Sequence, residues 1–537
     1  MNTTLLNTAK LLFLFLPTFM VAQNRYWVSF NDKSESLEQY KPSDFLSATS
    51  LQRRSDQGIE IQVNDYPVSP SYKNELLQMG YSIYRESRWL NAVSIQINET
   101  HNLKTIKELV FVKSVQKVKS YYREKVETIQ NNFVLDESDY GPSFGQIAQL
   151  NGHLLHEQEF KGAGKTIAVI DASFFRVNTL TMFDSLWQNN QILDTWDFVL
   201  NQPLDYTNDT IGSHGTMVLS CMGGYMVDSL IGTAPAASYL LYRTEDAASE
   251  TLTEEDNWVV AAESADAFGA DVINTSLGYS NLWDDLENTH TYDDMDGNTT
   301  VITIAADIAA SKGILVVNSA GNSGNSDWYY ITAPADGDSV LTVGAVGADS
   351  LIASFSSHGP TADGRMKPNV VSQGLASVVC NIGGGIQTAN GTSFSSPILA
   401  GMAATLWSAL PQLSSMELYN LIQESAHLYP NGNNDYGYGI PDFASVLQYI
   451  NLVESTKSQL AYYPNPISDF VVLDLAEFKQ QELVNISIYT TIGKLIYSES
   501  IVPKSHTKLN LSSLPSNSIY ILKATQKTKE FQCKLVK

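Results

Sequence analysis

Cysteine is scarce in this sequence, with only three residues in 537. Three are too few for a disulfide scaffold, and their spacing fits no cysteine-based metal site. Cys221 and Cys380 could pair in an oxidising compartment, but buried free thiols explain these two residues equally well.

Basic residues are also in short supply, with 33 against 57 acidic ones and a formal net charge of −24. Such a charge repels phosphate backbones, so a nucleic-acid partner is not expected.

Long apolar runs are missing as well. Residues 1–22 contain one short apolar run after Lys10 and end in small residues, which predicts a secretory signal peptide. No later segment is apolar over enough residues to be a transmembrane segment.

What the sequence does contain is the patterning of several domains, since 537 residues exceed one ordinary domain. Residues 24–135 combine alternating, strand-like segments with a helix predicted at 71–80, and they end in a polar stretch. This pattern predicts a small α+β module. Residues 460–537 alternate apolar and polar side chains in several short runs, which predicts a C-terminal β-sandwich module.

The largest unit, residues 140–450, has continuous apolar runs at 166–170, 313–317 and 340–346. Helical stretches such as 258–268 lie between them. Runs of this kind are typical of strands that are buried on both faces of a parallel sheet. We therefore predict an α/β fold with a doubly wound parallel sheet.

Four polar residues occupy places where chemistry is expected. Asp171 ends an apolar strand, at the edge where functional groups gather in open α/β sheets. His214 begins one apolar helix and Ser393 begins another, where the helix dipole favours developing negative charge. Asn322 lies in a glycine-flanked loop, from which its amide can donate to an oxyanion. Each residue alone also has an ordinary explanation as a helix cap, a core histidine or a turn residue.

Together, the four segments resemble the subtilase family. The strings are IAVIDASF around Asp171, GSHGTMVLS around His214, VVNSAGNSG around Asn322 and GTSFSSPILAG around Ser393. The order Asp, His, Ser along the chain is that of subtilisin and differs from the orders of chymotrypsin and the α/β-hydrolases. The resemblance covers residues 140–450, and the GTSxxSP string is its most specific part.

This resemblance implies a subtilisin-like serine endopeptidase that needs no cofactor for its chemistry and acts on protein or peptide substrates. Ser393 would attack the peptide carbonyl, and His214 would carry the proton. Asp171 would orient the imidazole, and Asn322 would donate to the oxyanion. The substrate-binding residues that the resemblance implies are Ser276, Leu277, Gly278, Ala320 and Gly321.

The flanking modules resemble the usual companions of an exported subtilase. Residues 24–135 resemble a subtilase propeptide with its processing segment, which implies a self-processed precursor. Residues 460–537 resemble the C-terminal sorting domain of the type IX secretion system of Bacteroidetes, starting at Tyr463-Pro464-Asn465-Pro466. The type IX secretion machinery is therefore an expected partner. The expected location is secreted or at the cell surface, by way of the periplasm and the outer membrane.

The sequence departs from the family pattern in several places. Ala172-Ser173 follows Asp171, where the family usually has Ser or Thr and then Gly. Phe394 replaces a methionine that many subtilisins carry. No catalytic group is lost, so we interpret the chain as a divergent active enzyme. The alternative is a catalytically silent subtilase fold that acts as a surface-binding protein.

Subtilases often bind Ca²⁺, and residues 293–298 form a cluster of hard oxygen ligands in which Asp294 and Asp296 are the candidates. The cluster lacks EF-hand spacing, because Gly297 comes too early. A structural calcium ion and a solvated acidic loop are both compatible with this sequence.

Overall fold

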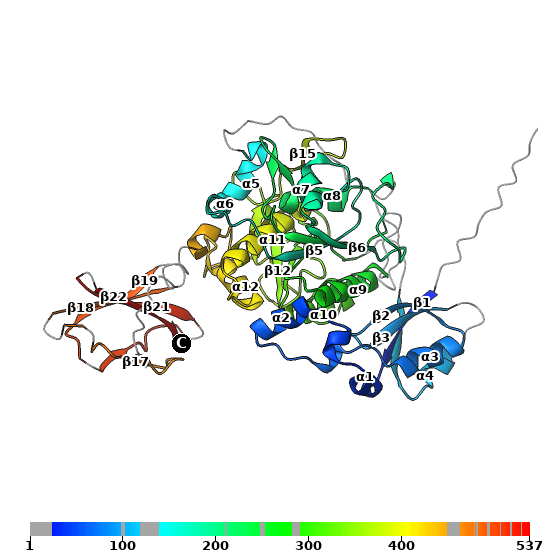
Figure 1. The fold of residues 1–537 in the computed structure, drawn as a ribbon, viewed down its shortest axis with the longest axis horizontal. Helices are drawn as coiled ribbons and strands as arrows, with labels where there is room; N and C mark the ends of the chain where they lie inside the picture. The colour runs from blue at the N-terminus through cyan, green and yellow to red at the C-terminus, as the bar shows by residue number, and fades with distance from the viewer. Residues whose placement is uncertain are drawn as a thin grey trace, which may run out of the picture.

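The computed structural model divides into an N-terminal module, a central domain and a C-terminal module (Figure 1). It describes residues 24–97, 103–118, 139–209, 212–246, 253–281, 290–447 and 462–537, without 477, 480–481, 491–493, 505, 516–517 and 528. The expected signal peptide at 1–22 lies outside the described residues, as does most of the polar stretch that ends the N-terminal unit.

A parallel sheet of seven strands forms the core of the central domain, in the order β13-β12-β11-β10-β5-β9-β6. Its strands are β5 (Thr166–Asp171), β6 (Ile192–Asp197), β9 (Ser238–Arg243), β10 (Val272–Thr275), β11 (Leu315–Ser319), β12 (Val340–Val346) and β13 (Val370–Gln373). The chain passes from β5 to the edge strand β6, returns to β9 between them, crosses β5 to β10 and then continues outward through β11, β12 and β13. The predicted doubly wound sheet is therefore confirmed, and the carboxyl ends of β5 and β10 form its switch point.

Helices cover both faces of this sheet (Figure 1). The longer ones are α8 (His214–Gly223), α9 (Thr253–Phe268), α10 (Val301–Ser311), α11 (Thr392–Ala409) and α12 (Ser415–Glu424). Ile167 and Val169 of β5 face the layer of α8 and α11, whereas Ala168 and Ile170 face the layer of α9 and α10. Both sides of the strand are buried, which explains its continuous apolar sequence.

Shorter elements complete the central domain. They are α5 (Phe144–Ala148), α6 (His153–Glu157), α7 (Asp184–Gln188), and two hairpins, β7 (Tyr225–Met226) with β8 (Leu230–Ile231) and β14 (Ser377–Cys380) with β15 (Ile386–Ala389). Within the described ranges, none of the helices combines the length and the apolar character that crossing a bilayer requires.

The N-terminal module is built on an antiparallel sheet in the order β2-β3-β1-β4. Its elements are β1 (Asn24–Phe30), α1 (Ser34–Gln39), α2 (Ala48–Asp56), α3 (Pro70–Gln78), β2 (Ser82–Ser87), β3 (Ala92–Ile97), α4 (Leu103–Lys107) and β4 (Val112–Val118). The module has a hydrophobic core of its own, formed around Val28, Leu76 and Ile95. The predicted α+β character is confirmed.

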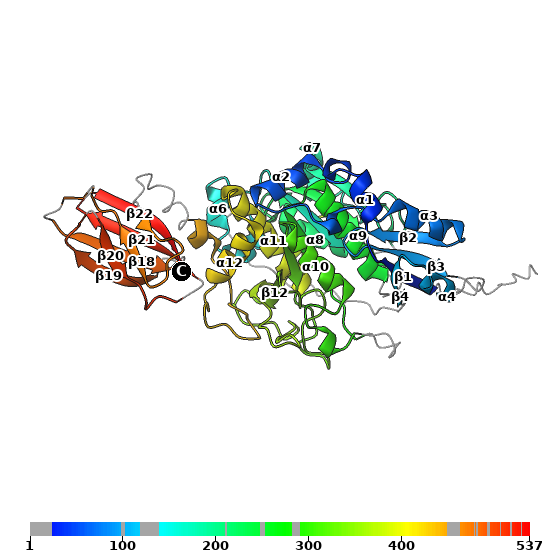
Figure 2. The same ribbon diagram turned by 90° about the horizontal axis from the view of Figure 1, so that it is seen from below.

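This module packs against α9 of the central domain, mainly through β2 and α2 (Figure 2). Buried ion pairs join the two parts. The carboxylate of Asp266 on α9 binds three guanidinium groups, those of Arg53 at 2.5 Å, Arg54 at 2.9 Å and Arg88 at 2.6 Å. Burial alone would raise the pKa of Asp266, but the three arginines outweigh it and lower that pKa.

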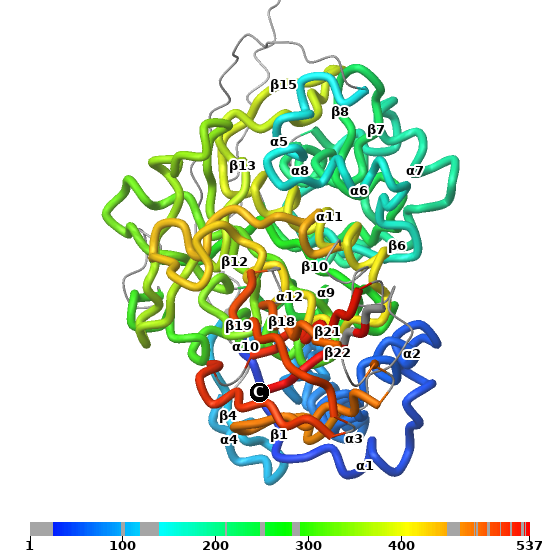
Figure 3. The backbone as a smooth tube through the Cα atoms, turned by 90° about the vertical axis from the view of Figure 1, so that its left-hand side faces the viewer, coloured from blue at the N-terminus to red at the C-terminus, as the bar shows by residue number. Residues whose placement is uncertain are grey.

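The C-terminal module consists of two antiparallel sheets, β16-β17-β20 and β19-β18-β21-β22, with one hydrophobic core between them. The strands are β16 (Tyr462–Tyr463), β17 (Phe470–Leu473), β18 (Val484–Thr490), β19 (Leu495–Ile501), β20 (Thr507–Asn510), β21 (Ile519–Gln526) and β22 (Lys529–Val536). β21 and β22 run side by side to the end of the chain (Figure 3). The predicted β-sandwich is confirmed.

Candidate active site

The carboxylate of Asp171 and the ring of His214 meet at the carboxyl end of the sheet. Asp171 ends β5 and is fully buried, and His214 begins α8. The His214 Nδ1 atom lies 2.7 Å from Asp171 Oδ1, and the histidine side chain is 29% exposed. An ionised carboxylate can only accept hydrogen bonds, so Nδ1 carries a proton and a neutral ring keeps Nε2 as an acceptor.

Gly215 allows α8 to approach the strand this closely. A Cβ atom at this position would lie 2.9 Å from Asp171 Cβ and would overlap the carbonyl oxygen of Ser173. A larger residue would push His214 away from Asp171. The histidine–glycine pair of the sequence is therefore explained by the contact between the helix and the strand.

The two carboxylate oxygens of Asp171 differ in the number of hydrogen bonds they accept. Oδ1 also accepts a hydrogen bond from the Ala172 backbone N–H, at 2.7 Å. Oδ2 is buried and has no hydrogen-bond partner within the part of the chain that the structure describes. Ala172 brings no hydroxyl to this carboxylate, unlike the Ser or Thr that the family resemblance leads one to expect.

Ser393 lies in the first turn of α11, directly after Gly391 and Thr392. Gly391 has φ of +150°, a backbone conformation that side chains other than glycine rarely adopt. The His214 ring lies next to this turn, with its centroid 6.1 Å from that of the Phe394 ring. The sheet and its helices thus bring the aspartate, the histidine and the serine to one edge.

The loop after β10 holds Ser393 in place. The Ser276 hydroxyl donates to the Ser393 carbonyl oxygen at 2.9 Å, and the Ser393 hydroxyl donates to the Ser276 carbonyl oxygen at 3.4 Å. The second distance is near the upper limit for a hydrogen bond, so the Ser393 side chain can leave this position at little cost. Leu277 and Gly278 follow, so the predicted substrate-binding segment borders Ser393.

Asn322 is oriented by Thr392. Its Oδ1 accepts from the Thr392 backbone N–H at 2.8 Å and from the Thr392 hydroxyl at 2.9 Å. A backbone N–H cannot accept, so the oxygen of the amide must be the atom that faces Thr392. The Asn322 Nδ2 atom then lies 3.6 Å from the position of a Cβ on Gly391, beside the turn that carries Ser393.

The loop that follows β11 supplies the remaining predicted residues. Ala320 is fully buried, and the Gly321 backbone N–H donates to the Thr392 hydroxyl at 3.2 Å. Thr392 therefore joins Gly321 and Asn322 to the start of α11. The sequence placed Thr392 beside the nucleophile but gave no signal for this orienting contact, because its partners lie about 70 residues away.

Comparison with protein families agrees with this geometry. A family model described as the subtilase family matches residues 162–439, slightly more than half of the chain. The chain belongs to the subtilase family. Two further models match, a peptidase S8 propeptide domain of Bacteroidota at residues 25–132 and a secretion system C-terminal sorting domain at residues 461–537.

Curated relatives of this subtilase include several bacterial proteases. Subtilisin E of Bacillus subtilis (strain 168) is 27% identical over 384 residues, which is 71% of this chain and 87% of subtilisin E. The subtilisin of Bacillus pumilus is 28% identical over 306 residues, covering 56% of this chain and 98% of that protein. The thermophilic serine proteinase of Bacillus sp. (strain AK1) is 31% identical over 281 residues, covering 52% and 60%.

These findings make the protein a serine endopeptidase with a propeptide and an export signal in its tail. The sorting domain directs this subtilase through type IX secretion to the cell surface or beyond. The N-terminal module is the propeptide, and it covers α9 on a face of the sheet remote from α8 and α11.

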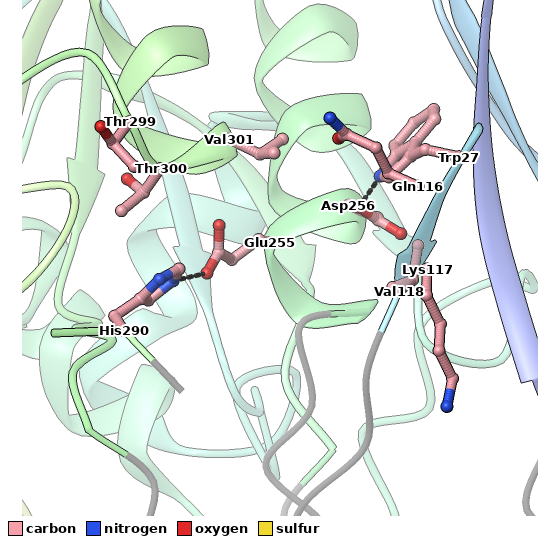
Figure 4. Close-up of a pocket in the computed structure, with 10 residues that line it drawn as sticks. All are labelled: Trp27, Gln116, Lys117, Val118, Glu255, Asp256, His290, Thr299, Thr300 and Val301. Carbon is pink, nitrogen blue, oxygen red and sulfur yellow. Dashed lines mark hydrogen bonds and ion pairs between the residues drawn. The ribbon is translucent and has the colours of Figure 1, made fainter. Parts of the chain in front are cut away.

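A cavity lies where the propeptide meets the N-termini of α9 and α10 of the subtilase (Figure 4). On the propeptide side, the Trp27 indole N–H donates to Asp256 Oδ1. On the other side, His290 Nε2 lies 2.6 Å from Glu255 Oε1. Burial raises the pKa of Asp256 well above its ordinary value, although the bond from Trp27 opposes this.

The acidic loop of the subtilase, residues 293–298, lies between His290 and Thr299 in the chain and uses its carboxylates locally. Asp294 Oδ2 accepts from the backbone N–H and the hydroxyl of Thr291, at 2.7 and 2.8 Å. Asp296 accepts from the Asn298 backbone at 2.8 Å and from the Thr299 hydroxyl at 2.9 Å. Among the described residues, no group of three or more His, Cys, Asp or Glu side chains is arranged to hold a metal ion.

The cysteines of the subtilase are free thiols in the structure, and all three are buried. Burial raises the pKa of Cys221 and of Cys380, so both thiols stay protonated and unreactive. The structure therefore agrees with the second of the two interpretations of this pair.

Proposed function

We propose that Ser393 is the nucleophile of this secreted endopeptidase and that His214 and Asp171 activate it. The 2.7 Å hydrogen bond between Asp171 Oδ1 and His214 Nδ1 carries this proposal. It keeps the proton on Nδ1, so that Nε2 can accept the proton of the Ser393 hydroxyl. A catalytically silent relative has no need for a buried carboxylate that fixes the tautomer of a partly exposed histidine.

In the proposed reaction, the Ser393 hydroxyl leaves the Ser276 carbonyl oxygen and turns toward the substrate. Its Oγ forms a bond to the peptide carbon as the proton passes to His214 Nε2. His214 then gives this proton to the leaving amine, and the C–N bond breaks. A water molecule repeats both steps on the acyl-enzyme and restores Ser393.

The negative charge of the tetrahedral intermediate falls on the former carbonyl oxygen. We assign its stabilisation to Asn322 Nδ2 and to the Ser393 backbone N–H. The Ser393 N–H lies in the first turn of α11, where the N–H groups have no helical carbonyl to bind. The contacts of Asn322 with Thr392 fix the amide before the reaction, which is what oxyanion stabilisation requires.

Substrate chains are proposed to pair in extended form with Ser276, Leu277 and Gly278, and to place one side chain between this segment and Ala320-Gly321. Leu277 is buried and Ser276 is tied to Ser393, so the segment is held rigidly beside the nucleophile. Proteins and peptides are the proposed substrates. The type IX secretion machinery is the proposed partner of residues 461–537.

The propeptide is proposed to be removed by the enzyme itself, through cleavage between residues 120 and 140. Most of that stretch lies outside the described residues. Self-processing makes the precursor dependent on Ser393, so a Ser393→Ala precursor is expected to keep its propeptide.

Active-site labelling tests the proposed function. The processed protein is treated with a fluorescent fluorophosphonate, and casein cleavage is measured in parallel. We expect the wild type to label and to cleave casein, and Ser393→Ala to do neither while showing the same circular dichroism. A folded wild type that neither labels nor cleaves would instead favour the surface-binding alternative.

Calcium is not needed for the proposed chemistry, and we propose that the 293–298 loop folds without it. The carboxylates of Asp294 and Asp296 already accept hydrogen bonds from their own loop, so a metal ion would have to displace those donors. We therefore expect a chelator to leave the Tm unchanged. Asp296→Asn keeps an oxygen for the Asn298 N–H, and its NH₂ group can donate to the Thr299 hydroxyl, so this variant should also be neutral. A chelator-induced fall in Tm would instead assign an ion to the protein.

A further inference from the structure

The chain that leaves β5 is fixed by contacts before and after Ser173. Arg243 Nε donates to the Ala172 carbonyl oxygen at 3.0 Å. The Thr216 hydroxyl donates to the Phe175 carbonyl oxygen at 2.9 Å. Ser173 lies between these two anchored residues, so its backbone has a defined place at the end of the strand.

Ser173 also lies close to the Asp171 carboxylate. A Cβ atom on Gly215 would overlap the Ser173 carbonyl oxygen and would lie 3.1 Å from Asp171 Cγ. Both residues therefore approach the same point at the start of α8. Both are fully buried.

Two polar atoms at this place have no hydrogen-bond partner among the residues that the structure describes. One is Asp171 Oδ2, and the other is the hydroxyl oxygen of Ser173. Each costs free energy when it is buried and left unpaired. An ionised carboxylate can only accept and a hydroxyl can donate, so the two groups are chemically complementary.

Other hydroxyl groups around the site are already engaged. Those of Thr216 and Ser276 each donate to a carbonyl oxygen at 2.9 Å. Thr244, whose backbone N–H donates to the Asp171 carbonyl oxygen, directs its hydroxyl at Glu245, 3.4 Å away. Among these neighbours in the described ranges, Ser173 is the residue whose hydroxyl remains for the carboxylate.

The separation of two residues along the chain suits such a bond. Elsewhere in the same protein, the Thr207 hydroxyl donates to Oδ1 of Asp205, two residues before it, at 2.7 Å. A serine hydroxyl moves between three staggered positions by rotation about the Cα–Cβ bond. Ser173 can therefore change the direction of its hydroxyl while its backbone stays in place.

We propose that Ser173 is a positioning residue of this enzyme and that its hydroxyl donates to Asp171 Oδ2. It replaces the hydroxyl that the family resemblance leads one to expect at position 172. With Oδ2 held in this way, Oδ1 stays directed at His214 Nδ1, and the imidazole keeps the tautomer that can accept the proton of Ser393. This inference rests on the proposed function, because Ser173 acts through Asp171 and His214.

The test compares processed enzymes that differ only in the position of one hydroxyl group. They are wild type, Ser173→Ala, Ala172→Ser and the double variant Ala172→Ser/Ser173→Ala. Hydrolysis of one peptide p-nitroanilide gives kcat and KM, and titration with a fluorophosphonate gives the concentration of active enzyme. Ser185→Ala is the matched control, since the Ser185 hydroxyl on α7 is also buried without a partner in the described residues.

We expect Ser173→Ala to lower kcat about tenfold with KM unchanged, because a hydrogen bond to a charged group is lost away from the substrate. The double variant should recover most of this loss, since it supplies a hydroxyl from the neighbouring position. Ala172→Ser should raise kcat much less in wild type than in the Ser173→Ala background. In proton NMR, the low-field resonance of the His214 Nδ1 proton should shift in Ser173→Ala and return in the double variant.

The proposal is overturned if Ser173→Ala has the kcat of wild type, or if the double variant is no more active than Ser173→Ala. The second result would assign the Ser173 hydroxyl to the fold, and so would a Ser173→Ala protein that does not fold and is not rescued by Ala172→Ser. Failure of the proposed function is distinct, because wild type itself would then neither label nor cleave the peptide.

Discussion

Asn322 is held by Thr392, which follows it by 70 residues in the sequence. The two hydrogen bonds to its Oδ1 leave only the Nδ2 group available to a ligand. Its side chain is otherwise exposed, so it contributes little to the stability of the fold. The effect of changing this residue should therefore appear in catalysis.

We predict that Asn322→Ala lowers kcat by about 10²–10³, the typical effect of losing one oxyanion donor, with little change in KM. The measurement is steady-state hydrolysis of a peptide p-nitroanilide. Asn325→Ala is the matched control, since Asn325 is an exposed asparagine in the same loop. An unchanged kcat in Asn322→Ala would remove this residue from the oxyanion site.

Phe394 gives the active site an apolar neighbour without sulfur. It is buried, and its ring centroid lies 6.1 Å from that of His214. Oxidation turns methionine into a polar sulfoxide, whereas phenylalanine is inert to mild peroxide.

We therefore predict that wild type keeps its activity in mild hydrogen peroxide and that Phe394→Met loses it. The residual activity of each protein after timed exposure to peroxide measures its tolerance. Rapid inactivation of wild type would indicate that a methionine elsewhere in the enzyme is oxidised. Met217 on α8 would then be the first methionine to replace by leucine.

At the scale of elements, the bounds of strands are predicted best from the sequence where the side chains on both faces of the strand are buried. β12 has the predicted bounds, and β5 extends by one residue to Asp171. β11 was predicted at 313–317 and lies at Leu315–Ser319. The predicted strand ends before Asn318 because asparagine is polar, but in the structure its Nδ2 group donates to the Ser319 carbonyl oxygen at 2.7 Å, which satisfies the donor side of the buried amide.

The candidate site was predictable for a different reason. Asp171, His214 and Ser393 each follow or begin an apolar element, so their positions at the sheet edge could be read from local sequence. The contacts of Thr392 with Asn322 and Gly321 could not, because they join loops whose distance depends on the whole sheet.

Helix α9 carries a buried carboxylate from which we predict that propeptide binding depends on pH. Asp256 is buried under Trp27 in the precursor, and its Oδ2 has no hydrogen-bond partner in the described residues. The charged groups that act on it are Glu255 on the same helix and Arg25 and Arg85 of the propeptide sheet, and His290 lies across the cavity (Figure 4).

Release of the propeptide uncovers Asp256, so its pKa is raised in the complex and falls toward 3.8 in the free enzyme. The complex therefore holds a proton that the free enzyme gives up. Propeptide binding is strongest below the ordinary pKa of the carboxyl group. Affinity weakens as pH rises toward the raised value, by about tenfold for each pH unit between the two.

We predict that the processed but undissociated complex activates faster as pH rises through this window. Samples are held at each pH for a set time and then assayed at one common pH, so that titration of His214 does not enter. Asp256→Asn keeps an acceptor for Trp27 and cannot ionise, so its activation rate should lose this pH dependence. If the activation rate of the variant depends on pH as strongly as that of wild type, another titrating group causes the dependence.

At the scale of the whole molecule, the C-terminal module has a hydrophobic core of its own and contributes none of the predicted site residues. We predict that a chain ending at residue 460 labels with fluorophosphonate like the full protein but stays inside the cell envelope. Fractionation of cells with an intact type IX system checks this. A full-length Ser393→Ala chain is the control, and its export should be normal.

The contact between Asn322 and Thr392 also bears on the stage of folding at which the enzyme gains its activity. The two residues can meet only after β11, β12 and β13 have taken their places beside β10. If Asn322 is the oxyanion donor, as proposed, a chain in which this sheet is incomplete lacks a positioned donor and is expected to cleave peptide bonds slowly. Full peptidase activity is therefore expected only after the central sheet has folded completely.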